Sequence, residues 1–196
     1  AHAVVTEMRG ALMREGSAAP GSAQVTAEVQ SAVKGRSRNA EAYRLHLQGS
    51  FFTNRYNEED TTKAIGYFHR AVELDPGYAS AWASLSFCYL TQGVNGWVPV
   101  AEGAERAREA AKRALEVEPD LAAGHWALGS VHMYYDWDWK AAESCMRRAL
   151  RLAPDDARLI VSAATLLLNL GQADEAAALV ARALAPLPNR SSVMTR

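Results

Sequence analysis

Two histidines in one expected helix are the residues whose chemistry most readily suggests a metal site. His125 and His132 would lie about two helical turns apart, or roughly 10 Å. That separation is too long for both imidazoles to bind one metal ion easily. We therefore expect both histidines to pack in the core between paired helices or at its boundary, and we predict no metal site.

Clustered carboxylates can act as general acids and bases, but their positions here favour a structural role. Residues 58–60 read Glu-Glu-Asp and residues 155–156 read Asp-Asp, each at an expected turn or helix start. Carboxylates there cap free N–H groups and interact favourably with the helix dipole. The sequence also lacks a Gly-rich phosphate loop and a nucleophile elbow. We predict no catalytic residues, no cofactor and no enzymatic activity.

Composition and charge narrow the class of protein. The 196 residues are 49% hydrophobic and 22% charged, which is enough apolar material for one domain or for an array of small repeats. The net charge is −1 and the basic residues are scattered, so no surface for nucleic acid or anionic membrane stands out. No apolar run approaches the roughly 18 residues that span a bilayer, and the first residues lack a signal-peptide pattern. We expect a cytoplasmic protein that binds neither nucleic acid nor membranes.

A repeated pattern organises most of the chain. Four prolines recur at intervals of about 34 to 43 residues, and each follows a helical segment with alanines at two fixed upstream positions. The prolines are Pro76, Pro119, Pro154 and Pro188. The alanine pairs are Ala64 and Ala71, Ala107 and Ala114, Ala142 and Ala149, and Ala176 and Ala183. A second apolar helical pattern follows each of the first three prolines, so the pattern indicates repeated helix pairs.

The helix pairs resemble the tetratricopeptide repeat. That family's signature places a large residue, Leu-Gly and Tyr in a first helix, then Ala, an aromatic, Ala and Pro in a second. Matching large and small residues include Leu45, Gly49 and Phe68 in the first repeat, Trp82, Leu85 and Tyr89 in the second, and Leu128, Gly129 and Met146 in the third. The resemblance covers residues 40–188 and implies an all-α fold, a right-handed superhelix of antiparallel helix pairs. The expected repeats are 40–78, 79–121, 122–156 and 157–189.

The two ends of the chain differ from the repeats. Residues 1–39 carry two amphipathic helical patterns, which predict helices that cap the array or belong to an upstream domain; their apolar residues are Val5, Met8, Leu12, Val25, Val29 and Val33. Residues 190–196 form a short tail. Because the chain starts at Ala1 without Met and stops soon after Pro188, we expect a fragment of a longer protein.

The turns between helices carry aromatic residues and candidate caps. Asn39 is expected to cap the first repeat's first helix, Thr61 or Thr62 its second helix, and Asp138 the second helix of the third repeat. In the segment YYDWDW (134–139) one residue is extra in the turn. We expect Tyr135 and Trp137 to pack over that turn against an adjacent helix pair, with contact to a partner as the alternative. Trp97, in the loop of the second repeat, is expected to fold back onto the helix tops, with contact to a partner as the alternative.

The resemblance also implies where a partner would bind, namely the concave face lined by first helices. The candidate residues on that face are Tyr43, His46, Ser50, Asn54, Phe87, Leu90, Thr91, Trp126, Ser130, Met133, Tyr134, Arg158, Thr165 and Asn169. Members of the family that bind chaperones hold terminal carboxylates with several Lys, Asn and Arg side chains, whereas Arg158 is the only inward cation expected here. An apolar peptide, or another domain of the same parent chain, therefore fits better. Alternatively, Phe87, Trp126 and Met133 pack only on neighbouring first helices.

A narrower resemblance concerns the parent protein. Three segments carry it: NAEAYRLHLQGSFFTNR (39–55), KAIGYFHRAVELDPGYASAWASLSFCYL (63–90) and YYDWDWKAAESCMRRALRLAPDDA (134–157). They look like the repeat arrays that follow catalytic or DNA-binding domains in bacterial adenylate and guanylate cyclases, winged-helix regulators and Ser/Thr kinases. This implies a non-catalytic interaction scaffold, the regulatory segment of a larger bacterial signalling or transcription-regulatory protein. The alternative is an assembly module that forms a homodimer through an uncapped last repeat, with Leu179, Val180, Leu184 and Leu187 partly exposed.

Overall fold

The computed structural model describes residue 37 and residues 39–184, which form helices joined by short connections. The helices are α3 (Ala40–Thr53), α4 (Glu58–Leu74), α5 (Ala79–Val94), α6 (Val100–Val117), α7 (Ala122–Val131), η1 (His132–Asp136), α8 (Trp139–Leu152), α9 (Ala157–Asn169) and α10 (Ala173–Leu184). The described part of the chain holds no strand, so the predicted all-α fold is confirmed. The helices predicted before residue 37, and the tail 190–196, lie outside the described residues.

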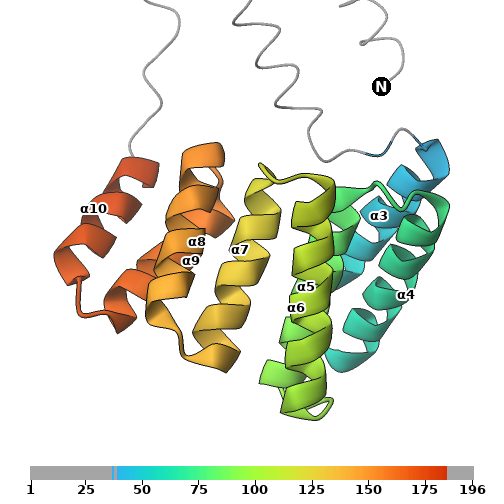
Figure 1. The fold of residues 1–196 in the computed structure, drawn as a ribbon, viewed down its shortest axis with the longest axis horizontal. Helices are drawn as coiled ribbons and strands as arrows, with labels where there is room; N and C mark the ends of the chain where they lie inside the picture. Colours follow the sequence, from blue (N-terminus) through green and yellow to red (C-terminus); the bar gives the residue numbers. More distant parts are fainter. Residues whose placement is uncertain (1–36, 38, 185–196) are drawn as a thin grey trace, which may run out of the picture. The chain divides into compact units, whose positions relative to one another are not determined.

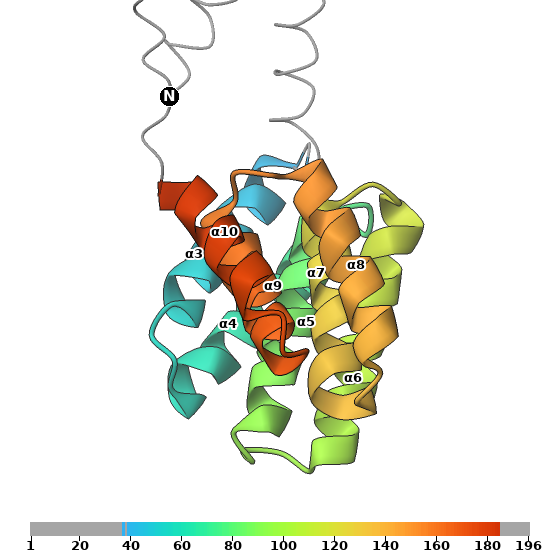
Figure 2. The same ribbon diagram turned by 90° about the vertical axis from the view of Figure 1, so that its left-hand side faces the viewer.

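The helices form four pairs that stack in sequence order. Each first helix packs on its own second helix, and each second helix packs on the first helix of the next pair. Figures 1 and 2 show the helices arranged side by side, with the turns inside the pairs along the lower edge of Figure 1. No single pair could bury its apolar surface alone, so the stacking of neighbours supplies the core. The result is an all-α helical solenoid.

Small residues set how closely the paired helices approach. Both signature alanines in each of the first three pairs are fully buried, and Ala176 of the fourth is 2% exposed. A Cβ built on Gly103 of α6 would lie 2.8 Å from Gly93 Cα of α5, so only glycines allow this approach. The helix pairs are therefore tight enough to fix the positions of the side chains on their outer faces.

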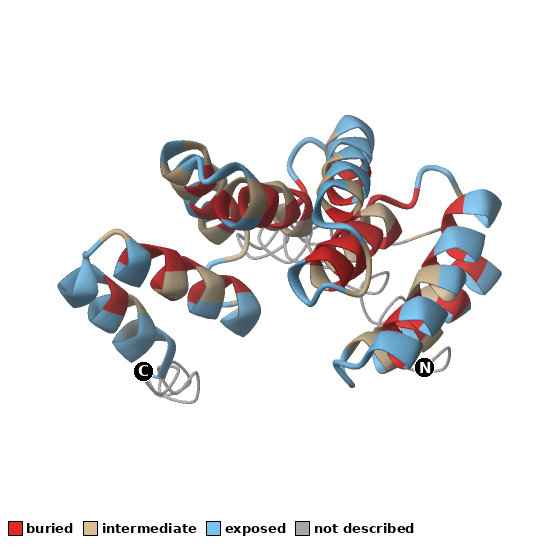
Figure 3. Cartoon of the chain, turned by 90° about the horizontal axis from the view of Figure 1, so that it is seen from below, coloured by how far each residue is buried: buried red, intermediate tan, exposed pale blue. Residues whose placement is uncertain are grey.

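Large side chains fill the space between neighbouring pairs. Phe68 lies against Gly49, and with Leu45, Tyr78 and Leu85 it belongs to a fully buried cluster shared by the first two pairs. A second cluster joins the last two pairs, with Met133, Met146 and Leu166 at its centre. Figure 3 shows the buried residues on the surfaces where helices face one another. The core thus lies between helices, in several clusters along the array.

Polar side chains cap the helices where the chain turns. The Asn39 side chain accepts hydrogen bonds from the backbone N–H groups of Glu41 and Ala42, and that of Asp138 accepts one from Ala141, so both predicted caps are confirmed. The expectation of Thr61 or Thr62 is wrong. Asn57 caps α4 and accepts from the Asp60 N–H, because its extended backbone starts the helix at Glu58.

The extra residue of the YYDWDW segment is taken up by a π-helix. Residues 132–136 form η1, whose wider turn accommodates one more residue than an α-helical turn. Tyr135 packs against the cluster of the first two pairs and donates its hydroxyl hydrogen to the Leu90 carbonyl oxygen at 2.8 Å. The expected packing against an adjacent pair is therefore confirmed for Tyr135. It is wrong for Trp137, which is 68% exposed and contacts only the Trp139 ring among the described aromatic residues.

All four turns within the pairs contain a residue in the left-handed conformation. These residues are Tyr56, Gly96, Trp137 and Gly171, with φ between 51° and 74°. Glycine adopts this conformation without a steric penalty, whereas other residues lose roughly 1–2 kcal/mol. The first and third pairs thus carry an aromatic residue where the second and fourth carry glycine.

Candidate functional site

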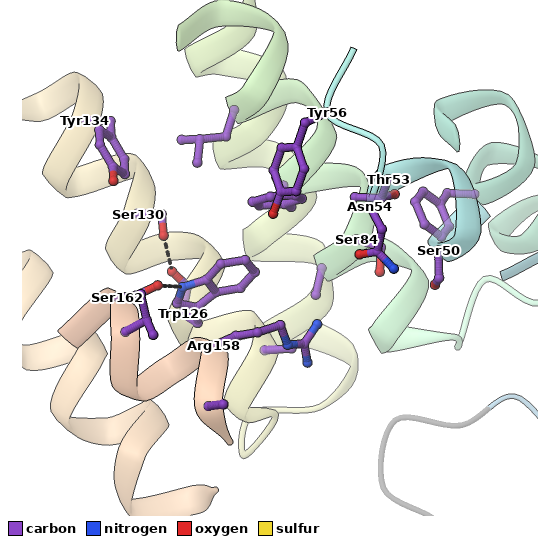
Figure 4. Close-up of a pocket in the computed structure, with 17 residues that line it drawn as sticks. Ser50, Thr53, Asn54, Tyr56, Ser84, Trp126, Ser130, Tyr134, Arg158 and Ser162 are labelled. Atoms are coloured by element: carbon purple, nitrogen blue, oxygen red, sulfur yellow. Dashed lines mark hydrogen bonds between the residues drawn. The ribbon is translucent and has the colours of Figure 1, made fainter. Parts of the chain in front are cut away.

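A cavity of about 500 Å³ opens on the face formed by the first helices α3, α5, α7 and α9, which we call the inner face. Figure 4 shows its side chains converging from these helices and from the turn after α3. Its lining residues are Ser50, Thr53, Asn54, Tyr56, Phe68, Ala83, Ser84, Phe87, Leu90, Ala123, Trp126, Ser130, Tyr134, Ala157, Arg158, Val161 and Ser162. The site therefore draws on all four pairs.

Three of the aromatic rings that line the cavity contact one another in a row. Phe87 of α5 and Trp126 of α7 stack with ring centroids 5.2 Å apart and planes inclined by 29°. Tyr56 approaches Phe87 edge-on at 6.5 Å. The Trp126 indole N–H donates to the Ser162 hydroxyl of α9 at 2.8 Å, which fixes the indole. The rings thus present a rigid aromatic surface, a common anchor for apolar ligand groups.

Most hydroxyl groups around the cavity are bonded to their own helices. Ser50, Ser84 and Ser130 each donate to the carbonyl oxygen four residues earlier, at 2.9 Å. The Ser84 oxygen lies 3.1 Å from His46 Nε2, and because its own hydrogen is already donated, it accepts from the imidazole. Burial lowers the pKa of His46 to about 4. His46 is therefore neutral near pH 7 and adds no positive charge to the inner face.

Arg158 supplies the positive charge at the cavity. It is the one charged residue among the described lining residues. Its guanidinium contacts Asp156, with Nε–Oδ1 and Nη2–Oδ2 distances of 3.4 and 3.1 Å. Burial acts to raise the pKa of Asp156, but the hydrogen bonds and charge of Arg158 outweigh it and hold that pKa below its usual value. Asp156 thus remains an anion that orients Arg158.

The structure brings many of the predicted inner-face residues together. Eight of them line the cavity: Ser50, Asn54, Phe87, Leu90, Trp126, Ser130, Tyr134 and Arg158. Phe87 and Trp126 also pack on neighbouring first helices, as the alternative reading expected. The binding role of all these residues stays a prediction.

Six predicted residues lie elsewhere. Tyr43 and Asn169 are exposed outside the cavity, and His46 is packed between the Phe68 and Tyr78 rings. Met133 is 3% exposed and belongs to the core, because η1 turns it inward. Thr91 and Thr165 donate to carbonyl oxygens of their own helices. Neither of the two candidate loop residues, Trp97 and Trp137, lines the cavity.

Nine lining residues are not among the fourteen candidates. Four of them, Thr53, Ala83, Ala123 and Val161, occupy the family's other inward positions on the first helices, whereas the remaining five do not. Phe68 was assigned to the core alone, and Ala157 and Ser162 fall outside the family's usual contact positions. Ser84 could have been predicted, because it lies three residues before Phe87 and therefore on the same face of α5. Tyr56 lies in a turn, and its left-handed backbone has no signal in the sequence.

A larger hollow of about 870 Å³ beside α4, α5 and α6 is a weaker candidate site. Its rim carries charges of both signs, from Glu102, Glu105, Arg106, Arg108, Glu109 and Lys112. Arg106 is paired with Glu102 at 2.7 Å, and Arg108 with Asp136 at 2.7 Å. These mutual pairs leave little charge to attract a ligand.

His125 and His132, the two candidate metal ligands, each lie beside an oxygen atom of the protein. His125 Nε2 lies 2.9 Å from the Pro119 carbonyl oxygen, and His132 Nδ1 lies 2.8 Å from Asp136 Oδ2. Within residues 39–184, no three His, Cys, Asp or Glu side chains are placed to hold a metal ion. Nor is any helix of that part long and apolar enough to cross a membrane.

Residues 138–194 match the tetratricopeptide repeat family. A thermophilic tetratricopeptide repeat protein from Thermus thermophilus superposes with a TM-score of 0.65 at 22% identity, over 83% of this chain and 81% of that one. This is a tetratricopeptide repeat fold. The first such domain of Spaghetti (RPAP3), bound to an HSP90 peptide, superposes with a TM-score of 0.50 at 13% identity, over 67% and 94% of the two chains.

A curated relative extends the comparison to a longer protein. The chain is 32% identical over 89 residues to a putative adenylate cyclase 3 of Rhizobium meliloti, strain 1021. The match covers 45% of this chain and 15% of that relative. The similarity therefore concerns a small part of the cyclase.

Proposed function

We propose that these repeats form a non-catalytic scaffold that binds a peptide or a partner domain at the inner-face cavity. The observation that carries this proposal is the stack of the Phe87 and Trp126 rings, which lines the cavity. The hydrogen bond from the Trp126 indole to Ser162 keeps the indole in this position. A rigid aromatic surface with few charges binds apolar side chains at a low entropic cost. The peptide-bound relative supports the same use of this fold.

We further propose that the chain is the interaction segment of a larger bacterial signalling protein in the cytoplasm. The similarity to part of a putative adenylate cyclase supports this placement. Another domain of the parent chain is then as suitable an occupant of the cavity as a separate peptide. Neither nucleic acid nor a membrane is an expected partner, since the cavity lining carries one charged residue.

Selection from a displayed library of random peptides tests the binding proposal. We expect peptides that bind the intact chain and lose at least about tenfold in affinity with Trp126→Ala, because one anchor contact is worth over 1 kcal/mol. Val161→Trp provides a second variant, since Val161 lines the cavity but is 63% exposed, so the larger side chain fills the cavity without disturbing the core.

Trp137→Ala is the matched control, because Trp137 is exposed but does not line the cavity. It should leave peptide affinity unchanged. Enriched peptides that bind both cavity variants as tightly as the wild type would refute the inner-face site, as would a failure to enrich any peptide.

A second candidate function is self-assembly through the last pair. Leu168 of α9 and Val180 and Leu184 of α10 are exposed, and Leu184 reaches 79% exposure. Burying such side chains stabilises an interface by roughly 1.5–3 kcal/mol each. Leu187, predicted for the same surface, lies outside the described residues. Light scattering should show a dimer at high concentration that Leu184→Glu converts to a monomer; a wild-type monomer would exclude this assembly.

A further inference from the structure

The cavity has room and suitable walls for one large apolar side chain. Phe87 and Trp126 form one wall, and the Tyr56 ring meets Phe87 edge-on from the turn after α3. The indole N–H, the polar group of Trp126, is already bonded to Ser162, so an apolar group on the ring face leaves no donor without a partner. The volume of about 500 Å³ is well above that of a single side chain.

The Tyr56 ring lies at the cavity and not in the core. Tyr56 has φ 51°, whereas glycine takes the left-handed position in the turns of the second and fourth pairs. The ring remains 67% exposed, so burial does not offset the cost of roughly 1–2 kcal/mol that this conformation imposes. Trp137 has the same conformation outside the cavity, so it is the position of the Tyr56 ring beside Phe87 that links Tyr56 to the cavity.

Arg158 adds one charge to this apolar surface. Asp156 engages two of the five N–H donors of a guanidinium, at rather long distances. The Asp156 carboxylate also accepts from the Arg158 backbone N–H at 2.9 Å and caps α9. Arg158 is exposed and extends from α9 beside Trp126 in Figure 4. No carboxylate is among the described lining residues, so an incoming anion would bind the guanidinium donors that Asp156 leaves free and would share the cation with Asp156.

We propose that the cavity selects a peptide segment in which one large apolar side chain, aromatic or long aliphatic, stands close to a single carboxylate. The apolar side chain enters between Tyr56 and the Phe87–Trp126 stack, and the carboxylate pairs with Arg158. Tyr56 is a specificity-determining residue that closes one side of the cavity. This inference rests on the proposed peptide-binding function and specifies the chemistry of its ligand.

The random-peptide selection tests the charge requirement when it is repeated with Arg158→Glu. With the wild type, we expect enriched peptides to carry a large apolar residue with Asp, Glu or the peptide's own C-terminus nearby. With Arg158→Glu, Lys or Arg should replace the acidic residue, because the sign of the cavity's charge is reversed. Synthetic copies with free and amidated C-termini then distinguish a terminal carboxylate from an Asp or Glu side chain.

Affinities of an enriched peptide test the individual residues. Arg158→Gln should weaken binding about tenfold, since a charge-assisted pair is lost. Tyr56→Gly should also weaken binding while the chain stays as stable as the wild type or becomes more stable, because glycine favours the left-handed turn. Trp137→Gly makes the same backbone change outside the cavity and should leave binding unchanged.

The outcomes separate this inference from the function on which it rests. Peptides that need Trp126 but show no acidic preference, or the same preference with Arg158→Glu, would overturn the inference and leave the scaffold function standing. Unchanged affinity in Tyr56→Gly would overturn the role of Tyr56. If no Trp126-dependent peptide is recovered, the inner-face binding site itself fails.

Discussion

Single side chains determine both the packing and the charge of the inner face. His46 is the clearest example, because its imidazole is enclosed by the Phe68 and Tyr78 rings and donates to Ser84. Burial favours the neutral form of His46, so protonation of this imidazole at low pH opposes the packing of the helices around it. Gly49 plays the matching steric role, since its missing side chain makes room for Phe68.

The stability of the array should therefore fall as the solution is acidified from pH 6.5 towards pH 4. The pKa of His46 is about 4 in the folded chain, whereas an exposed histidine, as in the unfolded chain, has a pKa of 6.5. The unfolded chain therefore binds more protons between these two pH values. The stabilisation is present above pH 6.5 and decreases by up to about 3 kcal/mol as the pH reaches 4. Urea unfolding at several pH values measures it, with His46→Gln as the control. An equal slope in the wild type and the variant would contradict this assignment.

Alanine substitutions at Gly49 and at Gly66 should change the stability of the chain in opposite directions. A Cβ on Gly49 would lie 2.6 Å from the Phe68 ring, so Gly49→Ala should destabilise the chain by roughly 1–3 kcal/mol. A Cβ on Gly66 meets nothing within 4 Å, and Gly66→Ala should stabilise α4 by about 0.5–1 kcal/mol. Thermal melts compare them directly. Similar shifts in both variants would show that Phe68 is not packed on Gly49.

At the level of helices, the π-helix η1 decides which residues of the third pair face the cavity. Its wider turn changes the helical register after Val131, so Met133 points into the core while Tyr134 lines the cavity and Tyr135 reaches α5. The repeat register placed Phe87 and Trp126 on the inner face, where both line the cavity, because they lie within the regular helices α5 and α7. It misplaced Met133 because the location of one extra residue within a helix or turn has no sequence signature.

Removal of the hydroxyl of Tyr135 should loosen the contact between the third and second pairs. The Tyr135 hydroxyl donates to the Leu90 carbonyl oxygen across that contact, so Tyr135→Phe should lower the free energy of unfolding by about 1 kcal/mol. Tyr134→Phe is the control, because Tyr134 is 45% exposed and should change stability little. Chemical denaturation measures both. Equal effects of the two variants would mean that the hydrogen bond does not contribute to stability.

At the scale of the whole array, the repeats made the fold predictable and left part of the site unpredicted. Recurring alanines and prolines are enough to place helix pairs, since close helix approach needs small residues at fixed spacing. The cavity also depends on features between the repeats. Tyr56 acts from a strained turn, and Ser162 positions Trp126 across the gap between α7 and α9. Such contacts follow from three-dimensional packing and not from repeat position.

The tryptophans provide the most direct test of the central claim that a peptide occupies the inner-face cavity. Each of the five indole N–H groups gives its own signal in a nitrogen–proton NMR spectrum of the labelled chain. On addition of an enriched peptide, we expect the Trp126 signal to shift most, with smaller or no shifts at Trp97 and Trp137. A shift of the Trp97 or Trp137 signal, with the Trp126 signal unchanged, would place the peptide on the turns and contradict the account.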